Sequence, residues 1–89
     1  MQIESDKDFR AVREQFNVWR HRFPMFAKDV DRIEKTVEEH IQEHSKILVL
    51  HRQTKNKSYL EKAQQEIDKI NKVLNTVEKI ELMAMLSKG

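Results

Sequence analysis

The chain has 89 residues, with one glycine, one proline and no cysteine. A chain this short forms a single domain, residues 1–89, and so few turn residues exclude a multi-stranded β fold and a glycine-rich phosphate loop. The lack of cysteine excludes disulfides, Cys-ligated zinc and iron–sulfur clusters. Lysine and arginine total 17 against 15 aspartate and glutamate, so the formal net charge of +2 indicates neither a strongly basic nor a strongly acidic protein.

The first predicted helix covers residues 6–23. Ser5 and Asp8 match a capping box, in which the cap residue and the third helical residue bind each other's backbone N–H groups. Apolar residues then recur in steps of three and four, the spacing that places them on one helix face: Phe9, Val12, Phe16, Trp19 and Phe23. Pro24 follows at once, and because proline disfavours helical geometry at the preceding residue, it should end the helix.

Two longer helices are predicted over residues 25–53 and 58–86. Each has apolar residues in steps of three and four, and the polar residues 54–58 between them have turn chemistry. A link this short makes the two helices fold back as an antiparallel hairpin. The sequence therefore predicts an all-α fold, in which a short N-terminal helix packs on a long, coiled-coil-like hairpin to make a three-helix bundle.

The half of the hairpin near its turn lacks cover from the first helix. That helix is about 27 Å long, against about 42–45 Å for each hairpin helix. Residues 47–50 are four consecutive apolar residues that cover more than one helix face, and residues 80–86 form a second such cluster. We therefore expect a homo-oligomer, most simply a dimer, whose interface uses these apolar residues: Ile47, Leu48, Val49, Leu50, Ile67, Leu82, Met83, Met85 and Leu86.

Residues 40–44 read His-x-x-Glu-His, the inverted zinc-protease signature. His40 and His44 share a helix face, and Glu43 has the chemistry of a general base. Such an enzyme also needs a further ligand and an enclosed cleft, which a short helical hairpin does not provide. His44 and His51 lie seven residues apart on the apolar stripe, where protonation would add a charge, as in a pH switch. The favoured interpretation is polar residues at a helix interface, so we expect no catalytic activity, metal or cofactor.

The basic residues support an alternative function, the binding of nucleic acid. Four arginines lie near Trp19 in the first helix and a second basic group lies at the hairpin turn, which offers charge for phosphates and a ring for base stacking. The simpler interpretation is a solvated helix face with Trp19 in the core. If a symmetric oligomer joined the two groups, the contacts would come from these residues: Arg10, Arg13, Arg20, Arg22, Arg52, Lys55 and Lys57.

The apolar pattern gives no sign of a membrane or secretory segment. No apolar run approaches the ~18 residues of a membrane-spanning helix, and the first residues lack the apolar core of a signal peptide. We expect a cytoplasmic, non-enzymatic module that binds a second copy of itself. Nucleic acid is the alternative partner, and we expect no membrane contact and no small-molecule substrate.

Overall fold

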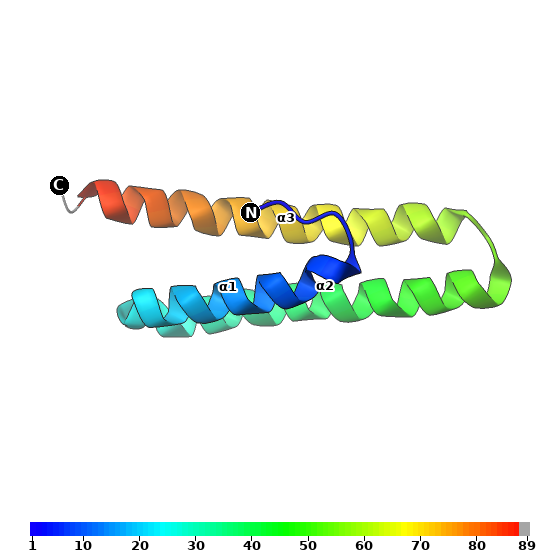
Figure 1. Ribbon diagram of the computed structural model, residues 1–89, viewed down its shortest axis with the longest axis horizontal. Helices are drawn as coiled ribbons and strands as arrows, with labels where there is room; N and C mark the ends of the chain where they lie inside the picture. The colour runs from blue at the N-terminus through cyan, green and yellow to red at the C-terminus, as the bar shows by residue number, and fades with distance from the viewer. Residues whose placement is uncertain (88–89) are drawn as a thin grey trace.

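The computed structural model describes residues 1–87, and these form helices and turns without any strand. The described chain is a slender bundle with extents of 54 × 18 × 17 Å, in which α2 and α3 make the long hairpin and α1 lies against α2 (Figure 1). The all-α prediction is confirmed. The elements are, in chain order, η1 (Asp6–Asp8), α1 (Phe9–Arg22), η2 (Pro24–Phe26), α2 (Ala27–Thr54) and α3 (Ser58–Ser87).

The first helix begins and ends where its sequence signals lie. The capping box forms, with the Ser5 hydroxyl accepting a hydrogen bond from the backbone N–H of Lys7 and the Asp8 carboxylate accepting one from that of Ser5. The first turn is nevertheless a 3-10 turn, η1, so the α-helix proper starts at Phe9. At the other end Phe23 leaves helical geometry directly before Pro24, as the steric effect of proline requires.

The turn between α2 and α3 is tight. Lys55 has a left-handed backbone (φ 56°), and its N–H donates to the carbonyl of His51 at 2.7 Å. This geometry ends a helix, although glycine adopts it at lower cost than lysine. The Asn56 side chain accepts a hydrogen bond from the N–H of Ser58 at 3.0 Å, so Asn56 satisfies a backbone N–H at the start of α3.

The core lies where the apolar stripes of the three helices meet. Val12 and Phe16 of α1, Val37 of α2, and Ile70 and Leu74 of α3 have at most 1% of their surface exposed. They belong to one cluster of buried side chains that runs through the bundle. The helical spacing in the sequence therefore identified the buried face of each helix.

The segment before η1 also contributes to the core, which the helix pattern did not predict. Residues 1–5 run alongside α3 (Figure 1), and Ile3 is only 2% exposed. The backbone N–H of Ile3 donates to Asn71 Oδ1 at 2.7 Å, and Asn71 Nδ2 donates to the Ile3 carbonyl at 2.8 Å. The amino group of Met1 contacts the carboxylate of Glu78. We call residues 1–5 the N-terminal strap, because they hold the start of α1 against α3.

Candidate functional site

Large apolar side chains are exposed at one end of the bundle. This open end consists of η2, which joins α1 to α2, and of the last turns of α3, which extend past that turn (Figure 1). Seven large apolar residues there expose between 47% and 78% of their surface. They are Met25, Phe26, Ile80, Leu82, Met83, Met85 and Leu86.

The local sequence explains why α3 cannot cover these side chains itself. Successive helical residues point about 100° apart, so one helix face accepts only every third or fourth residue. Val77 and Ala84 lie at that spacing on the covered face, and Val77 is 9% exposed. Leu82 and Leu86 are four residues apart on the opposite face and form an apolar ridge. Such an all-round apolar helix end is typical of a helix that is covered on every side.

A cavity of about 420 Å³ lies between α3 and the α1–α2 turn at the same end. This volume falls within the range of small-ligand pockets, and the cavity is partly open to solvent. The chain therefore leaves space here that its own side chains do not occupy. The apolar part of the lining comes from all three helices and includes Trp19, Phe23, Phe26, Ile33, Val77 and Ile80.

Two buried polar atoms on the cavity wall have no hydrogen-bond partner among the described residues. They are Nε1 of Trp19, a donor, and Oε2 of Glu81, an acceptor. The other carboxylate oxygen of Glu81 is 3.6 Å from Arg22 Nη1. An unpaired buried polar group costs about 1–3 kcal/mol, so this end of the bundle is not at its lowest attainable free energy.

The other apolar residues of the predicted interface lie towards the α2–α3 turn, and some of them are buried within a single chain. Ile47 is 7% and Ile67 is 2% exposed, because both pack inside the hairpin of a single chain. These two side chains therefore expose little surface to a second copy. The apolar stripe of α2 runs through His44 to Ile47, which leaves Leu48 half-buried and Val49 and Leu50 exposed.

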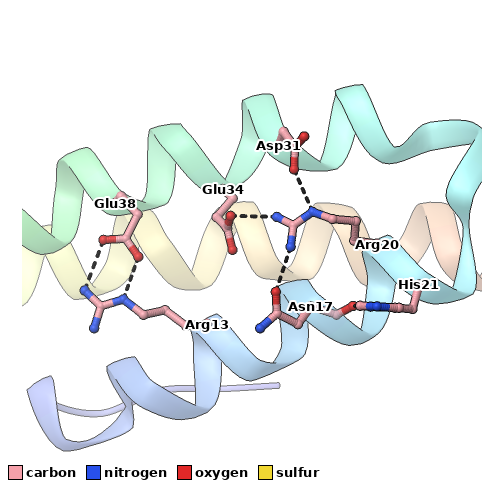
Figure 2. A network of polar contacts seen from close by, with 7 residues as sticks. All are labelled: Arg13, Asn17, Arg20, His21, Asp31, Glu34 and Glu38. Carbon is pink, nitrogen blue, oxygen red and sulfur yellow. Dashed lines mark hydrogen bonds and ion pairs between the residues drawn. The ribbon is translucent and has the colours of Figure 1, made fainter.

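Two of the arginines of α1, Arg13 and Arg20, join this helix to α2 through ion pairs (Figure 2). Arg13 makes a two-pronged contact with Glu38, at 2.6 Å from Nε and 3.0 Å from Nη2. Arg20 donates from Nε to Asp31 and from Nη2 to Glu34, both at 2.7 Å. The hydrogen bonds to Glu38 and to Asp31 raise the pKa of Arg13 and of Arg20, respectively, above the usual arginine value. Both side chains thus remain charged and carry carboxylate partners.

The structure does not bring the predicted nucleic-acid contacts together. Arg10 is 3.4 Å from Glu14, and Arg22 is 3.6 Å from Glu81, so all four α1 arginines have a carboxylate within ion-pair distance. The second basic group is exposed at the α2–α3 turn, at the far end of the bundle from η2 (Figure 1). It consists of Arg52, Lys55 and Lys57. The two groups therefore form no shared basic face on one chain.

The three residues of the His-x-x-Glu-His pattern face different surroundings. His40 Nδ1 is 2.7 Å from Oε2 of the buried Glu66 on α3. His44 is buried edge-on against the Phe9 ring, with centroids 5.3 Å apart, and Glu43 is exposed. Within residues 1–87, no three His, Asp or Glu side chains are grouped so as to hold a metal ion. His51, the other histidine of the apolar stripe, is half-buried near the α2–α3 turn.

Sequence reasoning missed the cavity and the ion-pair partners of the arginines. A signal for the ion pairs was present, because the residue numbers of Arg13 and Glu38 add to the same value as those of Arg20 and Asp31. A constant sum is what two antiparallel helices produce at matched heights. No comparable signal exists for a cavity, since its volume depends on how the side chains of three helices meet.

Comparison with known proteins adds no further assignment: no protein-family model, curated protein or solved structure matches the chain. No helix in the described part of the chain is both long enough and apolar enough to cross a membrane.

Proposed function

We propose that the protein is a helical interaction module that binds a second copy of itself through the open end. The observation that supports this is the concentration of seven exposed, large apolar residues at one end of the bundle, beside an unfilled cavity. Single exposed apolar residues are common on monomers, but contiguous patches of several hundred Å² usually mark an interaction site.

The exposed area agrees with what a stable dimer requires. The exposed fractions of the seven residues add up to about four fully exposed side chains. At roughly 200 Å² for a large side chain, this is on the order of 800 Å², which is the area each partner contributes to a standard-size interface. The flexible methionines, Met25, Met83 and Met85, suit such a surface because they adapt to the shape of a partner.

The same observations weigh against nucleic acid as the primary partner. The α1 arginines would have to give up carboxylate partners at 2.6–3.6 Å before they could bind phosphates. Of the seven predicted contacts, only the three at the α2–α3 turn make no ion pair with the residues that the structure describes. Three charges provide a weak electrostatic footprint compared with the 6–10 phosphate contacts of a typical specific binder.

Sedimentation velocity across a dilution series tests the proposal. We expect the wild-type chain to sediment as a dimer at micromolar concentration, and the double variant Leu82→Glu/Met83→Glu to sediment as a monomer. Two buried charges should weaken the association by at least about 100-fold, equivalent to about 2.8 kcal/mol. Both positions are exposed, so circular dichroism should show an intact helical fold.

Val49→Glu is the matched control, because Val49 is also an exposed apolar residue but lies in the opposite half of the bundle. It should leave the dimer unchanged. A monomeric wild-type chain would refute the proposal. A dimer that Val49→Glu disrupts and the double variant leaves intact would move the interface to the α2–α3 turn.

A further inference from the structure

We infer that the cavity at the open end is a binding site for a small, uncharged and largely apolar molecule. The inference goes beyond the proposed self-association and does not depend on it. A cavity of about 150 Å³ is enough to hold benzene, so the volume of about 420 Å³ between the three helices accommodates a molecule with two or three rings. No small molecule was expected from the sequence, because a cavity leaves no periodic pattern in it.

The first argument is the concave shape of the site. Trp19, Val30 and Val77 are buried lining residues and form its floor. Phe26 and Ile80 also line the cavity but are exposed, so they form its rim. A mostly apolar lining that passes from a buried floor to an exposed rim is typical of a site that encloses most of a small ligand.

The second argument concerns charge. Three charged residues line the cavity, which are Asp29, Arg32 and Glu81. Glu81 has a positive neighbour, since its Oε1 is 3.6 Å from Nη1 of Arg22, and Asp29 lies within one helix turn of the oppositely charged Arg32. These four charges cancel, so neither an anion nor a cation meets a net attraction. An uncharged ligand fits this border, because a charged one would lose strong hydration on entering an apolar site.

The third argument is the pair of unpaired polar atoms on the cavity wall. Nε1 of Trp19 is a donor and Oε2 of Glu81 is an acceptor, and neither has a hydrogen-bond partner among the described residues. Small-ligand sites typically combine an apolar lining with a few polar groups that orient the ligand. A hydroxyl group can accept from the first atom or donate to the second. We therefore expect the ligand to carry one such group on its apolar body.

The uncharged dye N-phenyl-1-naphthylamine tests the site, because its absorption overlaps the emission of tryptophan. Trp19 is the only tryptophan and lines the cavity, so bound dye should quench its emission by energy transfer, saturably and with one dye per chain. The sulfonated dye 8-anilinonaphthalene-1-sulfonate has similar rings but a negative charge, and it should bind more weakly by about tenfold. No quenching by the uncharged dye, or equal binding of the sulfonated one, would overturn the inference.

A matched pair of variants locates the dye. Ala84→Phe adds a ring to the cavity wall and should weaken dye binding by about tenfold, because the ring competes for the same space. Ala11→Phe is the control, since Ala11 is exposed on α1 and does not line the cavity, and it should leave binding unchanged. Circular dichroism should show that both variants keep the helical fold. Equal dye binding by the two variants would overturn the inference, because the dye would then lie outside the cavity.

Displacement of the dye by 1-naphthol and by naphthalene tests the polar group of the ligand, because the two molecules differ by one hydroxyl. 1-Naphthol should displace the dye at the lower concentration, although naphthalene is more apolar, since only the hydroxyl can pair with Trp19 Nε1 or Glu81 Oε2. Tighter binding of naphthalene would overturn the assignment of a polar group.

The double variant Leu82→Glu/Met83→Glu separates this inference from the proposed function. It should bind the dye as the wild type does, because neither residue lines the cavity. A wild-type chain that is monomeric but binds the dye would refute the proposed function and support this inference, and a dimer that binds no dye would do the reverse. Dye binding that is lost in the double variant would overturn the inference, because the dye would then depend on the dimer or on the exposed apolar side chains.

Discussion

The N-terminal strap gives the sharpest test of how this fold is held together. Asn71, which is 6% exposed, satisfies both backbone groups of Ile3, with hydrogen bonds of 2.7 and 2.8 Å. Asn71→Ala removes both partners at once. If the strap stays docked, two buried polar groups are left unpaired, and if it leaves, the side chain of Ile3 is exposed to water.

The expected loss in the free energy of unfolding follows from comparing these two responses to Asn71→Ala. Two hydrogen bonds contribute about 0.5–1.5 kcal/mol each, and burial of the Ile3 side chain contributes about 1.5–3 kcal/mol. Undocking, however, returns about 1–2 kcal/mol of backbone entropy per released residue, so the loss cannot exceed the net free energy of docking. We expect Asn71→Ala to lower the free energy of unfolding by about 1–2 kcal/mol, which for a chain of this length lowers Tm by roughly 5–15 °C.

Urea and thermal unfolding followed by far-UV circular dichroism measure this change. The protomer concentration must be fixed, because association makes apparent stability depend on it. Asn75→Ala is the matched control: Asn75 lies one turn further along α3 and is exposed. If both variants change the unfolding free energy by the same amount, within about 0.5 kcal/mol, the Ile3–Asn71 contact does not hold the strap and the reasoning is wrong.

Three further predictions follow from single side chains. Lys55→Gly should raise the unfolding free energy by about 0.5–1 kcal/mol in urea titrations, because glycine adopts the left-handed φ of 56° without the steric cost of a Cβ atom; a loss of stability would contradict that helix end. His44→Leu should be neutral or stabilising by up to about 1 kcal/mol, since it removes the unpaired buried Nδ1 but also loses the edge contact with Phe9; calorimetry that shows a large loss would point to an unrecognised partner. Arg13→Ala should cost about 0.2–1 kcal/mol, as for other exposed pairs, and the cost should shrink in high salt. The stabilisation that Arg13 contributes depends on pH with a definite sign. Folding raises the arginine pKa, so this stabilisation persists at neutral pH and is lost only when the pH rises through that folded-state pKa.

The helices were predictable because their signals are local. Pro24, the capping box at Ser5 and the polar turn at residues 54–58 each act on neighbouring backbone, so the sequence around them is sufficient. The helix ends consequently lie within a few residues of the expected positions once the two 3-10 turns are counted with their helices. Periodicity likewise identified the buried faces, since it depends only on helix geometry.

The remaining features depend on distant parts of the chain. Ile3 is a single apolar residue outside any helix, so no periodic pattern marks it as buried, and its partner Asn71 lies 68 residues away. The apolar run at residues 47–50 showed that α2 has more than one apolar face, but only packing against α3 decides that Ile47 is covered while Val49 and Leu50 are exposed. The cavity depends on three helices at once, and Ile80 and Phe26 both border it and face solvent.

The strap also has a consequence for the rates of folding and unfolding. The α1–α2 and α2–α3 contacts join helices that are neighbours in sequence, and contacts of this kind form early and fast. The Ile3–Asn71 pair instead closes a loop of 68 residues and can form only after the three helices have assembled. A contact that forms after the transition state slows unfolding and leaves the folding rate unchanged. The strap should therefore act as a latch that sets the lifetime of the native state. In stopped-flow kinetics, Asn71→Ala should raise the unfolding rate and leave the folding rate of the bundle unchanged.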